Sequence, residues 1–154
     1  MFSRRCAAAR ALLLPLLVTA TSLGALSERA EDGNRDGTVD TWIQEENGRI
    51  VSFSRDRNFD GSIDSRKVYH PSGAPQLEEL DFNFDGIMDD FYYYEEGVLI
   101  RQEIDTNFDG SVDVWVELVD GLYVASYEQD TDFDGTPDRR REFGRLPGVA
   151  RSPN

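Results

Sequence analysis

Hydrophobic and polar residues alternate along several stretches of this 154-residue chain with the two-residue period of a β-strand. The clearest alternating positions are Val112, Val114, Val116 and Leu118, followed by Tyr123, Ala125 and Tyr127. Asp120-Gly121 stands between these two runs, and an Asp-Gly pair in that position predicts a two-residue hairpin turn. This part of the chain is therefore expected to form two antiparallel strands.

The same pattern of strand, turn and strand recurs earlier in the chain. The turn pairs and their flanking runs are Asn47-Gly48 between Trp42-Ile43 and Ile50–Phe53, and Glu96-Gly97 between Phe91–Tyr94 and Val98–Ile100. A further connection, Pro71–Pro75, is longer and interrupted, and Pro75 argues against a strand that begins immediately after it. The chain therefore predicts a series of hairpins and no helices.

A nine-residue phrase, D-x-N/D-x-D-G-x-x-D, recurs five times along the chain. Its copies are Asp32–Asp40, Asp56–Asp64, Asp81–Asp89, Asp105–Asp113 and Asp130–Asp138. Their starts lie 24 or 25 residues apart, and a repeat this regular indicates one supersecondary unit stacked on copies of itself. The expected fold class is all-β, with tandem 24–25-residue β-hairpin repeats in an antiparallel meander joined by these loops.

Each loop carries oxygen-bearing side chains at positions 1, 3 and 5, glycine at position 6 and an acid at position 9. Ca²⁺ takes six to eight oxygens at about 2.3–2.6 Å, and a tight loop can direct alternate side chains at one centre. Glycine permits the positive φ of such a turn, and the carbonyl of position 7 can point inward. The candidate calcium ligands are Asp32, Asn34, Asp36, Thr38, Asp40, Asp56, Asn58, Asp60, Ser62, Asp64, Asp81, Asn83, Asp85, Ile87, Asp89, Asp105, Asn107, Asp109, Ser111, Asp113, Asp130, Asp132, Asp134, Thr136 and Asp138.

The loops depart from an EF-hand at position 12, where an EF-hand has a bidentate Glu and this chain has Ile43, Lys67, Tyr92, Val116 and Arg141. They resemble the aspartate-rich calcium repeats of thrombospondin type 3 arrays, without the dense cysteines of those arrays. They are also similar to bacterial secreted proteins built from tandem D-x-N-x-D-G repeats. The resemblance covers Asp32 to about Asp138 and implies a metal loop, but no particular biological role. Candidates for the missing ligands are Glu79, Glu103 and Glu128, each two residues before a loop.

The alternative interpretation is that Asp, Asn and Gly simply make good turns, which need no metal. That explains one or two copies, but not an acid at position 9 in all five. Without a cation, carboxylates about 4 Å apart would repel by up to roughly 4 kcal/mol per pair at an effective dielectric near 20. Metal binding is therefore the favoured interpretation.

Position 4 is phenylalanine in four loops, at Phe59, Phe84, Phe108 and Phe133. We expect these rings to pack one unit on the next, because repeat arrays need such a contact. The alternative is an exposed aromatic row that binds a sugar or peptide. The apolar residues at position 8 are expected in the same core, and these are Val39, Ile63, Met88 and Val112. The last unit, with Pro137 at that position and Arg139–Arg141 after it, is expected to be a degraded cap that binds metal weakly.

Residues 1–27 have the layout of a secretory signal peptide. Three arginines precede an apolar run from Ala11 to Val18, no acid occurs before Glu28, and Ala25-Leu26-Ser27 is an acceptable cleavage site. Cleavage after Ala20 or after Ser22 is an alternative. The run is too short for a permanent membrane span. The expected organisation is a signal peptide at 1–27, a calcium-binding repeat array at 28–146 and a disordered tail at 147–154.

The composition narrows the range of functions that the chain is expected to have. The net charge is −14, and −17 once residues 1–27 are removed, which argues against nucleic acid as a partner. The sole cysteine, Cys6, lies before the apolar run, so metal rather than a disulfide is the expected staple of the mature chain. His70 is the only histidine, and no catalytic triad or zinc cluster is apparent, so no enzyme is expected.

The sequence therefore predicts a secreted or periplasmic protein whose fold is stapled by Ca²⁺ and whose role is structural or binding. The alternative function is a recognition module that binds an extracellular protein or glycan through surface aromatics, with calcium secondary. Burial of the position-4 phenylalanines would favour the first function, and their exposure would favour the second.

Overall fold

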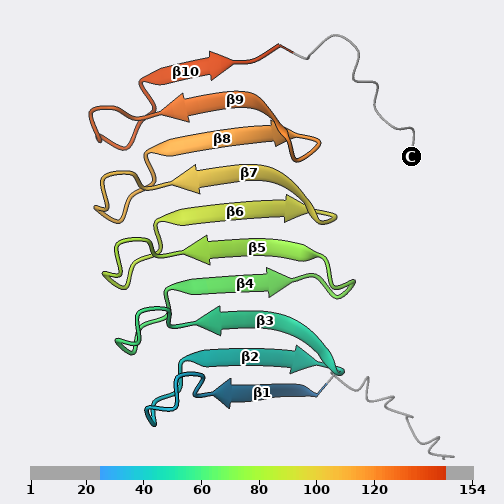
Figure 1. Cartoon of the computed structure of the whole chain (residues 1–154). Helices are drawn as coiled ribbons and strands as arrows, with labels where there is room; N and C mark the ends of the chain where they lie inside the picture. The colour runs from blue at the N-terminus through green and yellow to red at the C-terminus, as the bar shows by residue number, and fades with distance from the viewer. Residues whose placement is uncertain (1–24, 145–154) are drawn as a thin grey trace, which may run out of the picture.

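The computed structural model describes residues 25–144, which form one ten-stranded antiparallel sheet in the order β1 to β10 (Figure 1). Each strand pairs only with its neighbours in sequence, so the sheet is an open meander and not a barrel. The strands are β1 Leu26–Glu31, β2 Thr41–Glu46, β3 Arg49–Arg55, β4 Ser65–Tyr69, β5 Pro75–Leu80, β6 Asp90–Glu95, β7 Val98–Ile104, β8 Val114–Val119, β9 Tyr123–Gln129 and β10 Arg139–Glu142. The predicted fold class is confirmed.

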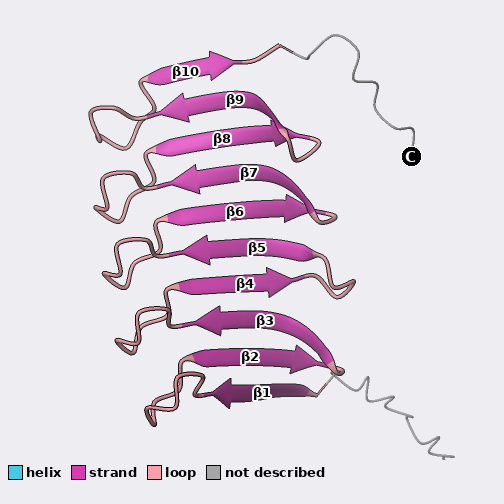
Figure 2. Cartoon of the chain, viewed as in Figure 1, coloured by secondary structure: helices cyan, strands magenta, loops and turns pink. Residues whose placement is uncertain are grey.

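The described residues contain no helix (Figure 2), and none of them forms a helical segment that is long and apolar enough to cross a membrane. Residues 1–24 and 145–154, which hold most of the predicted signal peptide and the predicted tail, lie outside the described part of the chain. Leu26 and Ser27 do belong to it, and they pair with Glu46 and Glu45 of β2. A cut after Ser27 would therefore remove the first two residues of β1, whereas a cut after Ala20 or Ser22 would leave this strand whole.

Two kinds of connection alternate along the sheet, one on each side (Figure 1). Every nine-residue aspartate loop joins an odd strand to the next even strand, so all five loops lie on the same side. The other side carries the hairpin turns. Two of these turns, Asn47-Gly48 and Glu96-Gly97, have two residues with positive φ, as a type I′ hairpin requires. The hairpin at Asp120-Gly121 also forms, but its connection has three residues, because Val119 pairs with Tyr123 and Leu122 belongs to the turn. The predicted hairpins are thus confirmed apart from that turn length, and β1 adds a strand before the first loop.

The expectation that Pro75 would prevent a strand is wrong. Pro75 is the first residue of β5 and pairs with Tyr69 next to an irregularity in the register of β4. Proline is tolerated at the first position of a strand because its missing N–H need not take part in the ladder there. The turn before it is closed by the N–H of His70, which donates to the carbonyl of Ala74 at 2.9 Å.

The described sheet is a single layer, because no strand contacts any but its neighbours. Its only buried hydrophobic residues in the described range are Ile43 and Val114. The most deeply buried side chains are instead seven loop aspartates: Asp56, Asp64, Asp81, Asp89, Asp105, Asp113 and Asp130. Carboxylates thus occupy the buried positions that aliphatic side chains hold in a globular domain.

The expectation that the position-4 phenylalanines are buried core residues is also wrong, although Phe84 does contact the preceding unit, where the guanidinium of Arg57 lies 5.4 Å from its ring centre. Phe59, Phe84, Phe108 and Phe133 are each between 39% and 49% exposed. They have φ between 58° and 66°, a left-handed conformation at the turn of the loop. Most contacts between units are made by strand pairing and by backbone hydrogen bonds between adjacent loops. Of the position-8 residues, Ile63 is exposed, while Val39, Met88 and Val112 are half-buried.

Candidate metal-binding loops

The aspartate at position 1 organises each loop by accepting backbone hydrogen bonds. In the first four loops its Oδ1 accepts the N–H of position 4 at 2.6–2.7 Å. In all five loops its Oδ2 accepts the N–H of the position-6 glycine at 2.7–2.8 Å. These contacts bend the chain around the carboxylate, which explains why the glycines have φ between 86° and 97°.

Positions 3 and 5 lie close together on the exposed side of the loop. In the first four loops the asparagine Nδ2 donates to the position-5 aspartate Oδ2 at 2.8–2.9 Å. In every loop the Oδ1 of that aspartate accepts the N–H of position 7 at 2.8–2.9 Å. The side chains of positions 1, 3 and 5 thus lie within one short turn, and their role as metal ligands stays a prediction.

The aspartate at position 9 closes the loop from the other end. In the second loop the Oδ2 of Asp64 accepts the N–H groups of Arg57 and Asn58, and in the third loop the Oδ2 of Asp89 accepts those of Phe82 and Asn83. The second oxygens of these two carboxylates, Asp64 Oδ1 and Asp89 Oδ1, are buried and have no hydrogen-bond partner.

A third orphaned oxygen is Oδ1 of Asp130, which occupies position 1 of the fifth loop. By contrast, the position-9 Oδ1 atoms of the first and fourth loops have a partner, because the hydroxyl of Thr41 donates to Asp40 and that of Thr106 donates to Asp113. A buried carboxylate oxygen without a partner is costly, so each of the three needs a donor or a cation from outside the chain, such as a water molecule or a metal ion.

Carboxylates come closest together in two of the loops. Ligand oxygens of Asp56, Asp60 and Asp64 lie within 4.8 Å of one another, and so do those of Asp130, Asp132 and Asp138. Among the described residues, no other three acids meet within this distance. The second and fifth loops are therefore the most nearly assembled metal sites. The inward orientation of the position-7 carbonyls stays a prediction.

Adjacent loops are joined by a repeated backbone hydrogen bond. The N–H of the position-1 aspartate donates to the carbonyl of the position-9 aspartate of the preceding loop. The four pairs and their distances are Asp56 to Asp40 at 2.9 Å, Asp81 to Asp64 at 2.8 Å, Asp105 to Asp89 at 2.7 Å and Asp130 to Asp113 at 2.8 Å. The loops thus form a continuous column along one side of the sheet.

No cationic side chain forms an ion pair with a loop aspartate in the described part of the chain. Burial raises the pKa of Asp89, and the negative charges of Asp81 and Asp85 add to the effect. In the fifth loop the charge of Asp134 raises the pKa of Asp132. Neighbouring negative charge contributes to both raised pKa values, and a divalent cation would relieve that contribution.

The expectation that Glu79, Glu103 and Glu128 supply the missing ligands is wrong in this structure. Their carboxylates lie on the strands in ion pairs: Glu79 with Arg66, Glu103 with Arg101, and Glu128 with Arg140. Arg66 stands directly opposite Glu79, and Arg140 directly opposite Glu128, in the strand registers. Cross-strand neighbours of opposite charge attract, so the sheet itself uses these acids.

Two of the three arginines after the fifth loop also have partners of their own. Arg140 pairs with Glu128 and Glu142, and the guanidinium of Arg141 lies 4.8 Å from the ring centre of Phe143. The fifth loop keeps the hydrogen bonds that positions 5 and 6 make in the others. Within the described residues a single strand, β10, follows it. The interpretation of this unit as a degraded cap stays a prediction.

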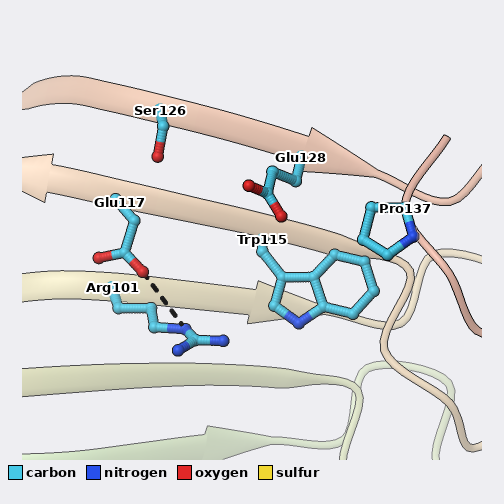
Figure 3. A pocket seen from close by; sticks show the side chains of 6 residues that line it. All are labelled: Arg101, Trp115, Glu117, Ser126, Glu128 and Pro137. Carbon is cyan, nitrogen blue, oxygen red and sulfur yellow. Dashed lines mark ion pairs between the residues drawn. The ribbon is translucent and has the colours of Figure 1, made fainter. Parts of the chain in front are cut away.

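Sequence reasoning missed a shallow pocket of about 380 Å³ on one face of the sheet. It is lined by Arg101, Trp115, Glu117, Ser126, Glu128 and Pro137 (Figure 3). Arg101 and Glu117 are 3.7 Å apart across β7 and β8, and the Trp115 ring lies toward Pro137 of the fifth loop. The alternation of Trp115 and Glu117 along one strand was the signal in the sequence, but the pocket also depends on the register of the neighbouring strands.

Comparisons with known proteins identify no family for this chain. No family model matches it, and no curated protein matches it. Among solved structures, a match was found to the crystal structure of accessory secretory protein 1,2 and 3 in Streptococcus pneumoniae, at 19% identity and a TM-score of 0.44. The match covers 61% of this chain and 18% of that one. A likeness this low carries no argument about function.

Proposed function

We propose that this chain is a secreted or periplasmic calcium-binding repeat protein in which Ca²⁺ holds the loop side of the sheet together, with a structural or binding role. The observation that carries the proposal is the deep burial of carboxylates that each have one oxygen without a partner and no paired cation, above all Asp64 and Asp89. A buried anion without compensation is among the most expensive features a fold can contain. A bound divalent cation would turn this cost into a stabilising interaction.

The residues that would hold the ion are the acids of positions 1, 5 and 9 with the side chain of position 3. In the second loop these are Asp56, Asn58, Asp60 and Asp64, three of whose carboxylates already lie within 4.8 Å of one another. Hard oxygen donors of this kind suit Ca²⁺, and a flexible loop suits its variable coordination. The ion would supply charge neutralisation and a rigid turn; nothing in the donor set is arranged for chemistry on a substrate.

Export is supported by the N-terminal sequence: the three arginines, the apolar run and the small residues Ala25 and Ser27. Loops that bind calcium at about 10⁻⁴–10⁻³ M, as extracellular modules typically do, would be filled outside the cell. The two parts of the proposal are thus compatible.

Calorimetric titration tests the metal site directly. We expect Ca²⁺ to bind in the range of about 10⁻⁴–10⁻³ M, and Mg²⁺ to bind more weakly, because Mg²⁺ demands near-octahedral geometry and gives up water reluctantly. Asp64→Asn should remove one site. Glu95→Gln, which neutralises an exposed acid at the end of β6, is the matched control and should leave the stoichiometry unchanged. Absence of Ca²⁺ binding, or equal binding of both ions, would contradict the proposal.

A second candidate function, recognition of a glycan or protein, is favoured by the exposure of the position-4 phenylalanines. Four aromatic rings lie on the loop side of the sheet in a left-handed backbone conformation, where a non-glycine residue costs of order 1 kcal/mol. Backbone preference does not explain why phenylalanine stands there, and partial burial explains it only in part. A ring kept on the surface at such a position is typical of a contact residue.

Stability measurements on one of these phenylalanines distinguish a structural role of the ring from a role in recognition. Phe108→Asn should raise the free energy of unfolding by roughly 0.5–1 kcal/mol if the half-covered ring makes no structural contact, because Asn tolerates positive φ better. Arg35→Asn changes the equivalent position of the first loop, where φ is 65°, and should give a similar gain. A loss of stability confined to Phe108→Asn would mean that the ring does pack structurally, and would remove the support for a recognition surface.

A further inference from the structure

We infer that copies of this chain associate end to end, with the outer edge of β10 in one copy pairing antiparallel with the outer edge of β1 in the next. The partner is a second copy of the same chain, and the contact would continue the internal sheet. This inference does not depend on metal binding.

Both ends of the described sheet are open. Within residues 25–144, β1 pairs only with β2 and β10 pairs only with β9, and all residues of these two strands are exposed. An outer strand presents backbone N–H and C=O groups that can pair with another strand, and a partner that already fits such an edge is the opposite edge of the same repeat array.

The column of loops has an unused hydrogen-bond acceptor at one end and an unused donor at the other, within the described residues. At each of the four internal junctions, the position-9 carbonyl accepts the N–H of the next position-1 aspartate at 2.7–2.9 Å. Within the described residues, the carbonyl of Asp138 in the last loop accepts no such bond, and the N–H of Asp32 in the first loop donates none. Placing one copy after another joins these two groups.

Strand direction also fits. Each odd strand runs antiparallel to the even strand before it, so β1 of a second copy would meet β10 in the orientation that β3 has to β2. Residues 25 and 144, at the limits of the described chain, both lie on the side of the hairpin turns (Figure 1). The loop side of each edge is therefore open for the contact between Asp138 and Asp32.

The internal register predicts which residues would face each other. At every even-to-odd pair, the first residue of the even strand stands opposite the last residue of the odd one: Thr41 and Arg55, Ser65 and Leu80, Asp90 and Ile104, Val114 and Gln129. The same register places Arg139 opposite Glu31 of the next copy, with Arg141 diagonal to that carboxylate. Opposite charges in these positions stabilise strand pairing.

Two like-charge pairs fall in the same register, Arg141 with Arg29 and Glu142 with Glu28. Two of these four residues already have an opposite charge on their own strand, since Arg29 pairs with Glu31 at 3.2 Å and Glu142 with Arg140 at 3.1 Å. Taken together, β10 carries three arginines and one glutamate, whereas β1 carries two glutamates and one arginine. The edges are thus complementary in net charge.

An edge of this kind does not close on itself. The contact is heterologous, because the surface on β10 differs from the surface on β1. Each copy that binds through one end keeps its other end free, so further copies can be added. The expected product is a distribution of chain lengths that grows with protein concentration, rather than a single dimer.

Sedimentation velocity of the purified chain in excess Ca²⁺ tests the inference, with two charge reversals. Arg139→Glu and Glu31→Arg should each weaken self-association about tenfold or more, because each brings like charges into direct opposition. An equimolar mixture of the two variants should associate again, since each copy's β10 then faces an opposite charge on the other's β1. Arg49→Glu, which makes the same change of charge on the internal strand β3, should associate like the unchanged chain.

Circular dichroism of each variant establishes that the sheet is retained. A chain that stays monomeric over about a hundredfold range of concentration would overturn the inference. So would a dimer of constant mass, or reversals that leave association unchanged or are not restored by mixing. Calcium binding of a monomeric chain would be unaffected, so failure of end-to-end association is distinguishable from failure of the proposed function.

Discussion

Removal of calcium is expected to lower the melting temperature of this chain by about 20 °C or more. At a free Ca²⁺ concentration tenfold above Kd, each filled site adds roughly 1.4 kcal/mol, so four sites add about 6 kcal/mol. One kcal/mol shifts the melting temperature of a domain of 60–100 residues by about 4–8 °C. The sheet has little else to compensate, because only Ile43 and Val114 are buried hydrophobic residues in the described range.

Thermal unfolding followed by circular dichroism, with excess Ca²⁺ and with EDTA, measures this difference. Addition of Ca²⁺ to the EDTA sample should restore the original transition, which separates metal loss from irreversible damage. High salt in place of Ca²⁺ is the control for general charge screening, and should restore only part of the stability. An unchanged melting temperature in EDTA would show that the loops are stable turns without a metal.

Asp89→Asn is expected to change stability in opposite directions with and without calcium. In EDTA the substitution should stabilise the fold by about 1–3 kcal/mol, because it removes a buried charge beside Asp81 and Asp85 and replaces an unpartnered oxygen with an NH2 donor next to those acids. An amide oxygen can still accept the N–H groups of Phe82 and Asn83. In excess Ca²⁺ the same change should destabilise the fold, because the site loses an anionic ligand.

Burial raises the pKa of Asp89, so the charged carboxylate destabilises the metal-free chain above that pKa, and its protonation relieves the cost. The advantage of Asp89→Asn in EDTA should therefore be largest near neutral pH and shrink as the pH falls through the raised pKa. Denaturant unfolding at several pH values measures it.

Asp113→Asn is the matched control for the expected change in stability, which for Asp89→Asn has opposite signs with and without calcium. Asp113 occupies the same position of the fourth loop, but its Oδ1 accepts the hydroxyl of Thr106 at 2.8 Å. With that oxygen already satisfied, the gain in EDTA should be absent or much smaller. If Asp89→Asn destabilised the chain equally with and without calcium, the carboxylate would have a purely structural role.

The loops and hairpins could be predicted from the sequence because their signals are local. An aspartate that accepts the N–H groups of positions 4 and 6, or an Asn-Gly pair at a turn, needs only residues a few positions away. The period of 24–25 residues then fixes the order of the strands. The candidate ligands fall in the predicted turns for the same reason.

The features that sequence reasoning missed all depend on contacts across strands. The burial expected for Phe108 assumed a second layer or an enclosed core, and the described sheet has neither. Glu79 is an ion-pair partner of Arg66 because register places the two opposite each other, 13 residues apart in sequence. The strand β1 shows no clear alternation and adjoins the predicted signal peptide, so only its pairing with β2 reveals it.

The position of both described chain ends on the turn side of a one-layer sheet has a mechanical consequence. Tension applied between residues 25 and 144 would act along the direction in which the strands are stacked, because these residues adjoin the two outermost strands. The force then lies along the backbone hydrogen bonds between neighbouring strands, and these bonds break one after another. Force applied parallel to the strands would instead load all the hydrogen bonds of a strand pair at the same time. Each 24–25-residue repeat so released would lengthen the tether by up to about 80 Å. The sheet would then unfold in steps under tension. Ca²⁺ bound to the loops, as proposed above, would raise the force that each step requires.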